Sequence, residues 1–140
     1  MDAAAWRDLL RDGHGWLELQ PPVDPDEIAA AEVRLGVTFP SELRGLFRAT
    51  DGIYDKRGQW FVLWRLEDVV QRNLEAGNGL DYATRRLLSI GDDGTGAPFC
   101  ITLDGESAVF SWSPIEREAR PLAPGLRKFW LGWLAGEIST

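Results

Sequence analysis

The sequence predicts one α+β domain, in which a sheet rich in antiparallel pairs packs against several helices. Apolar residues at helical spacing recur near both ends of the 140-residue chain. Between Leu87 and Trp112, short runs of branched and aromatic residues alternate with turns rich in Gly and Asp, a pattern typical of consecutive antiparallel strands. No repeat, linker or low-complexity segment interrupts the chain, so we expect residues 1–140 to fold as a single domain.

Helix signals occur in five segments, at residues 3–10, 24–36, 40–52, 66–74 and 123–138. The clearest start is Asp24, whose carboxylate can accept from the free N–H groups of a first turn. Pro25 fits the first helical position, and Gly36 suits a left-handed helix end. The second and third segments are therefore predicted to form a helical hairpin. The last segment is the most amphipathic, with an apolar face made of Leu126, Phe129, Trp130, Trp133 and Leu134.

Strands are expected at residues 59–66, 87–90, 98–103 and 108–112, with a shorter extended piece inside residues 13–23. In the first of these, Trp60 and Trp64 share one face, and Phe61 and Leu63 share the other. Both faces are therefore apolar, which favours a central strand covered on both sides over one that presents an exposed patch to a partner. Residues 50–58 are interpreted as a loop.

The chain is acidic, with a formal net charge of -7. Negative charge disfavours binding to nucleic acid phosphates and to anionic lipids, and it suits a basic protein partner, although it would also serve solubility alone. The N-terminus lacks the basic region and long apolar run of a secretory signal, and the apolar run at residues 60–64 is far too short to span a bilayer. A cytoplasmic protein without membrane contact is the simplest interpretation, and the oligomeric state is left open.

No motif for catalysis, for a metal or for a cofactor is recognisable. The acidic, Gly-rich segment 89–105 lacks the ligand spacing of an EF-hand and has no Lys for a P-loop, and its glycines are typical of a tight hairpin turn. His14 has no recognisable nucleophile or acid partner. Cys100 lies between two apolar residues, which indicates a buried and inert thiol. We therefore expect no enzyme activity, no metal and no cofactor.

The aspartates of this segment are instead candidates for partner binding. Asp92, Asp93 and Asp104 lie within residues 87–113, which contain no Lys or Arg. Turns without counter-charges project negative potential into solvent. We predict that these residues contact a basic surface of a protein partner, with ordinary solvated turn acids as the alternative interpretation of each.

The loop before the first aromatic strand adds further candidates. Asp51 and Asp55 would extend the acidic edge. Tyr54 and Trp60 are the aromatic candidates in the same region, since Tyr and Trp often anchor protein interfaces. The predicted contact surface thus combines acidic and aromatic side chains.

Four segments together follow a family pattern. Residues 32–40, with Glu32, Gly36 and Phe39, are followed by residues 46–52, where Asp51 stands in place of a usual Asn. An acidic Gly-rich block at 90–103 and a strand at 109–112 come later. In order and spacing these segments resemble the SUKH superfamily, which includes the fungal Smi/Knr cell-wall regulators. The resemblance covers roughly residues 24–136.

The resemblance implies an α+β fold without enzymatic activity. For bacterial members it implies immunity proteins, which bind and neutralise a toxin and so protect the producing cell. For fungal members it implies regulatory scaffolds of cell-wall synthesis. The leading hypothesis is therefore a domain that occludes a basic toxin domain. The alternatives are a regulatory scaffold acting on an endogenous protein, and a small-ligand binder with a pocket beside the Gly-rich turn.

Overall fold

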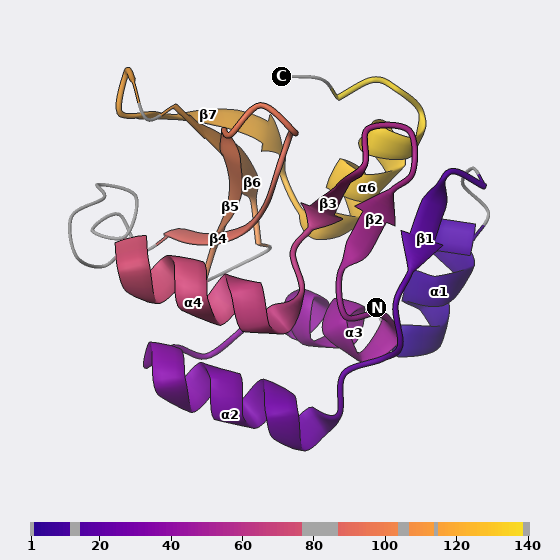
Figure 1. Cartoon of the computed structure of the whole chain (residues 1–140), viewed down its shortest axis with the longest axis vertical. Helices are drawn as coiled ribbons and strands as arrows, with labels where there is room; N and C mark the ends of the chain where they lie inside the picture. The colour runs from indigo at the N-terminus through magenta and orange to yellow at the C-terminus, as the bar shows by residue number, and fades with distance from the viewer. Residues whose placement is uncertain (1, 12–14, 77–86, 104–106, 114, 139–140) are drawn as a thin grey trace.

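The computed structural model of the chain describes residues 2–11, 15–76, 87–103, 107–113 and 115–138 (Figure 1). The helices within these ranges are α1 (Ala3–Arg11), α2 (Pro25–Leu35), α3 (Ser41–Ala49), α4 (Leu66–Ala76) and α6 (Leu126–Leu134). The strands are β1 (Leu17–Leu19), β2 (Ile53–Asp55), β3 (Trp60–Leu63), β4 (Leu87–Asp92), β5 (Pro98–Thr102), β6 (Val109–Ser113) and β7 (Glu118–Ala123). They form one antiparallel sheet in the order β1 to β7. The predicted α+β class is confirmed.

Two strands lie where the sequence predicts none. β2 falls in the expected loop, because its three residues are too few to show an alternating pattern, yet it pairs with both β1 and β3. β7 follows the last expected strand and carries Glu118, Arg120 and Pro121. It pairs with β6 at an edge of the sheet, where a proline and charged residues are tolerated. The interpretation of residues 50–58 as a loop is therefore wrong for residues 53–55.

The predicted helical hairpin is present, and its sequence signature explains its shape. The Asp24 carboxylate accepts from the first turn of α2, and Gly36 ends α2 with φ 68°. Glu32 then bridges the two helices. Its Oε2 accepts from the Phe39 backbone N–H at 2.8 Å and from the Arg44 guanidinium at 2.9 Å, and this bond and charge raise the pKa of Arg44. The family-like residues here hold the hairpin together.

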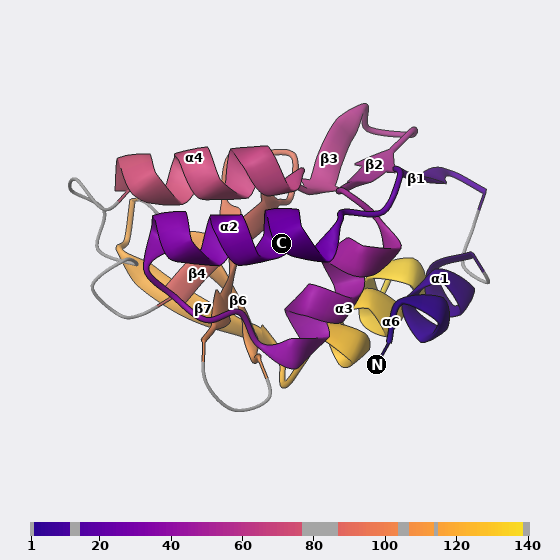
Figure 2. The ribbon, with the colours of Figure 1, turned by 90° about the horizontal axis from the view of Figure 1, so that it is seen from below.

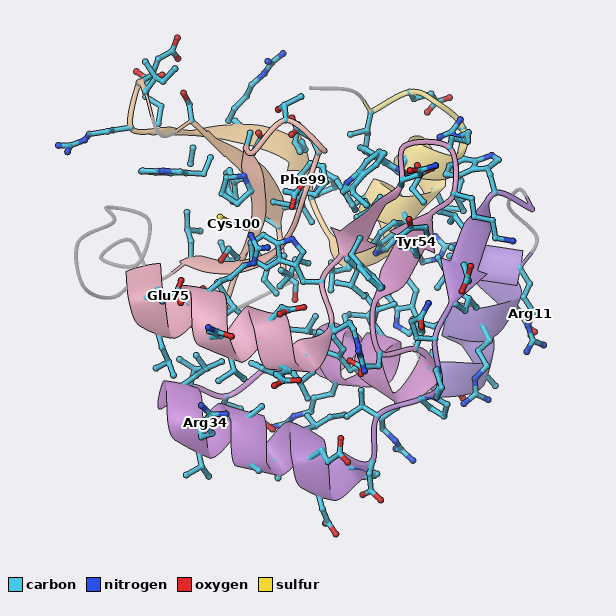
Figure 3. All side chains as sticks on the ribbon, viewed as in Figure 1. Arg11, Arg34, Tyr54, Glu75, Phe99 and Cys100 are labelled. Carbon is cyan, nitrogen blue, oxygen red and sulfur yellow. The ribbon has the colours of Figure 1, made fainter. Side chains whose placement is uncertain are left out.

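The main core lies between the helices and one face of the sheet. Phe99 of β5 contacts Phe129 and Trp133 of α6, with ring centroids 5.0 Å and 5.5 Å apart. Cys100, the next residue, lies on the opposite face of β5 (Figure 3), where it forms a smaller buried cluster with Trp112 of β6. Helices α2 and α4 run side by side (Figure 2). The sheet therefore has a covered face and a face with little helical cover around β5 to β7.

The seam between β3 and β4 joins the first three strands to the last four. Leu63 pairs with Gly91, and the Trp64 backbone N–H donates to the Ile90 carbonyl at 2.8 Å. The two backbones are unusually close here: a Cβ on Gly91 would collide with the carbonyl oxygen of Val62 and lie 2.8 Å from its carbonyl carbon. Glycine at position 91 is what allows this approach.

Beyond the seam, where β3 has ended, the side chain of Asn73 makes the hydrogen bonds with the β4 backbone. β3 ends before α4, and Asn73 of α4 takes its place beside β4. The Asn73 Oδ1 accepts from the Ser89 backbone N–H at 3.0 Å, and its Nδ2 donates to the Ser89 carbonyl and to the Val69 carbonyl, both at 2.7 Å. Asn73 thus satisfies both backbone groups of a residue that is completely buried.

Candidate functional site

The structure brings three of the predicted contact residues together. Trp60 begins β3 after the β2–β3 turn. Beside it, Asp92 ends β4 and Asp93 begins the β4–β5 turn. The Trp60 indole N–H donates to the Asp92 backbone carbonyl at 3.0 Å, across 32 residues of sequence. We call Trp60, Asp92, Asp93 and Gly94 the tryptophan-turn surface.

Trp60 is half-buried and held in one orientation. A Cβ on Gly58 would collide with the indole ring, and a Cβ on Gly94 would lie 3.3 Å from it, so both glycines leave room for the ring. On another side it meets Trp133 of α6 edge-on, with ring centroids 6.4 Å apart. A half-exposed tryptophan fixed in this way loses little entropy when a partner covers it, which favours a role as an anchor.

Asp92 links the turn to two tryptophans. In addition to the Trp60 bond at its backbone carbonyl, its Oδ2 accepts from the Trp64 indole N–H at 2.8 Å, and its Oδ1 accepts from the Gly94 backbone N–H at 2.7 Å. All three donors are uncharged N–H groups, so none of these bonds brings a counter-charge to the Asp92 carboxylate. Trp64 could not be assigned to this site from the sequence, because the contact joins residues 28 apart.

Asp93 shapes the tip of the same turn. Its Oδ1 accepts from the backbone N–H of Thr95 at 2.8 Å and from the Thr95 hydroxyl, which is an Asx-turn arrangement. Its own backbone N–H donates to the Ala97 carbonyl. The residue is half-exposed, so its carboxylate lies at the molecular surface.

Tyr54 belongs to the same hairpin but to the other side of the sheet. It pairs with Phe61 across β2 and β3, and their rings meet edge-on at 5.1 Å. Because side chains alternate along a strand, Phe61 and Tyr54 lie on the face opposite Trp60. Both are half-exposed (Tyr54 is labelled in Figure 3). In β3, only Val62 and Leu63 are fully buried, so the expectation of a strand covered on both sides is correct for its second half alone.

The predicted residue Asp55 is fully buried. Its Oδ1 accepts from the backbone N–H groups of Arg57 and Gly58 at 2.8 Å and 3.2 Å, so its carboxylate closes the β2–β3 turn. The Arg57 guanidinium lies 3.3 Å above the Trp16 ring, which turns this cation toward β1. Since Asp55 has no surface to offer to a partner, we leave it out of the proposed contact region.

Two other predicted residues lie elsewhere. Asp51 lies at the far end of β2, where its Oδ1 accepts from the Leu66 backbone N–H at 2.8 Å and its Oδ2 lies 3.4 Å from the Arg65 guanidinium. It caps the start of α4 and is separated from the tryptophan-turn surface by the length of β2. Asp104 lies outside the described residues, as does His14.

Within the ranges given above, no three His, Cys, Asp or Glu side chains gather in a way that could hold a metal ion. No helix in these ranges is both long and apolar enough to cross a membrane. Cys100 is buried in the small cluster beneath Trp112, and its burial raises the pKa of the thiol from 9.0 to about 12.

The buried thiol gives a testable pH dependence. Below pH 9 the thiol is protonated in the folded and unfolded states, whereas between pH 9 and pH 12 the unfolded state alone loses the proton. The free energy of unfolding should therefore fall with a slope approaching about 1.4 kcal/mol per pH unit across this interval. Urea unfolding at pH 8 and pH 10 measures the loss in the wild type and in Cys100→Ala, which should lose less. An identical loss in both proteins would contradict the assignment.

Comparison with known proteins finds a match to one protein family. Residues 22–131 match the SMI1 / KNR4 family (SUKH-1). This region contains the helical hairpin, the seam and the tryptophan-turn surface. A search of curated proteins finds no match to the chain. Since the matched residues make up most of the chain, the chain belongs to the SMI1/KNR4 (SUKH-1) family.

Proposed function

We propose that the chain is a non-enzymatic protein-binding domain of the immunity type, which neutralises a cognate toxin by covering it. Members of this family act through protein–protein interaction. As an immunity protein it would act in the cytoplasm of the producing cell, on a toxin domain of basic character. Its mechanism would be stoichiometric occlusion of the surface through which the toxin reaches its substrate.

The observation that carries this proposal is the construction of the tryptophan-turn surface. A pre-positioned Trp60 lies against a turn with two carboxylates, and the described part of residues 87–113 contains no Lys or Arg. The negative potential of the turn would accelerate the encounter with a basic partner, while burial of the indole would slow dissociation. Tyr54 and Phe61 offer a second aromatic contact on the other face of the hairpin.

The structure also determines how the charge should be tested. Reversing Asp92 would break the Trp64 hydrogen bond, so a change in binding could reflect damage to the fold. Asp93→Asn removes the charge and keeps an oxygen that can accept from Thr95. Asp24→Asn is the matched control, because an asparagine caps a helix as well as an aspartate does, and α2 lies at the opposite end of the molecule (Figure 1).

The test uses the basic protein that co-purifies from the native cell, once it has been shown to be toxic when expressed alone. We expect co-expression of the chain to restore growth. We expect Asp93→Asn to slow association roughly two- to fivefold at low ionic strength and much less at high salt, with Asp24→Asn unchanged. Equal effects of the two variants, or toxicity that co-expression does not relieve, would refute the proposal.

A further inference from the structure

A second feature lies at one end of the sheet, between the β4–β5 turn and the β6–β7 turn. It is a concavity with a volume of about 680 Å³. Trp112 and Ala119, which pair across β6 and β7, are among its lining residues, and Ala97 lines it from the β4–β5 turn. We call it the sheet concavity. It meets the tryptophan-turn surface at Asp93, which lines both.

One apolar side chain at this concavity is almost fully exposed. Ile115, in the β6–β7 turn, is 93% exposed, more than any other large apolar side chain in the described ranges. Trp112 beside it is only 2% exposed, so the inner part of the surface is rigid and packed over Cys100. When a partner covers an exposed isoleucine, the apolar surface removed from water stabilises the complex.

The rim of the concavity is acidic. Asp93, Glu116 and Glu118 line it together with Arg120, so three acids face one base and leave a formal excess of two negative charges. Glu116 and Glu118 are exposed. Arg117 lies in the same turn but is not a lining residue. This charge is complementary to a basic partner and repels an acidic one.

The lining residues also indicate which kind of contact would bind a partner. β7 forms an edge of the sheet, which could in principle accept a further strand. Pro121 of β7 has no N–H to donate, which disfavours strand addition at this edge. A partner would therefore be recognised through the side chains that line the concavity, not through main-chain pairing.

We propose that the sheet concavity docks a basic segment of the partner, with an apolar side chain of that segment on Ile115 and lysine or arginine side chains beside Glu116 and Glu118. This inference rests on the proposed function, because it assigns part of the toxin contact to a second face of the chain. Asp93 connects the two regions, so one partner could cover both.

The experiment uses a blocked pentapeptide that alternates lysine with leucine, titrated into the full chain and followed by amide NMR shifts. We expect the shifts to concentrate at residues 95–97 and 111–121. Ile115→Ser should weaken binding about tenfold and Glu118→Gln about threefold. The matched controls are Val33→Ser, which alters an apolar residue 80% exposed on α2, and Glu67→Gln on α4, and both should leave the affinity unchanged.

Three results would overturn the proposal: no saturable binding, shifts centred on another face, or equally strong binding of a peptide with serine in place of leucine. The same variants are then measured with the co-purified toxin. If the toxin complex is weakened by Asp93→Asn and not by Ile115→Ser, the sheet concavity fails as a docking site while the proposed function stands. If the peptide binds at the sheet concavity and the chain neutralises no toxin, the docking site stands and the proposed immunity function fails.

Discussion

Gly91→Ala is expected to destabilise the fold more than any other single methyl addition considered for this chain. The new Cβ would collide with the Val62 carbonyl oxygen, and both groups belong to backbone that cannot move without opening the β3–β4 seam. We expect a loss of about 4 kcal/mol or more in the free energy of unfolding. For a domain of this size that corresponds to a melting temperature lower by roughly 10 °C or more. Thermal and urea unfolding followed by circular dichroism measure it.

Gly15→Ala is the matched control. A Cβ at position 15 meets nothing within 4 Å, and the substitution is the same in chemistry. It should change the melting temperature by at most a few degrees. If Gly91→Ala melts within the same range, the close approach of the two backbones at the seam is not a real constraint.

Asn73→Leu is expected to have the second largest effect. A leucine at this position cannot make the bonds with the Ser89 backbone N–H and carbonyl, which lie beside β4 where β3 has already departed. The loss of two buried hydrogen bonds should lower the free energy of unfolding by about 2–4 kcal/mol. Native-state hydrogen exchange should show faster exchange of the Ser89 amide in this variant.

The control for this change lies two residues away. Gln71→Leu makes a similar amide-to-leucine substitution on α4. Within the described part of the chain, the Gln71 amide donates to the exposed Glu75 side chain and to no buried backbone group. We expect less than about 1 kcal/mol there. Similar losses in both variants would mean that helix propensity or solubility, and not the contact with Ser89, determines the effect.

The helices of this fold could be predicted from the sequence more fully than its strands. Local signals predicted the helices well, because the cap of Asp24 and the left-handed Gly36 act within a few residues. The strands β2 and β7 were missed. The first is too short to show a pattern, and the second carries the polar residues and proline that an edge strand tolerates. Their existence depends on partner strands, which no local window contains.

The candidate site, too, could be predicted from the sequence only in part. The aspartates and aromatic residues were identified by type and by the lack of counter-charges. Burial could not be predicted, so Asp55 was included although it closes a turn inside the protein. The contact of Trp60 with Asp92 and the exposure of Ile115 depend on the way distant segments meet. A lone isoleucine between Pro114 and Glu116 gives no signal in the sequence that it will be exposed.

The most direct test of the account is a titration of the toxin's activity with the purified chain. If the chain acts by covering its partner, activity should fall linearly and vanish at one equivalent, and it should return in full when high salt or dilution separates the two proteins. Inactivation by far less than one equivalent, or inactivation that persists after the chain is removed, would show that the chain alters its target chemically and would contradict occlusion.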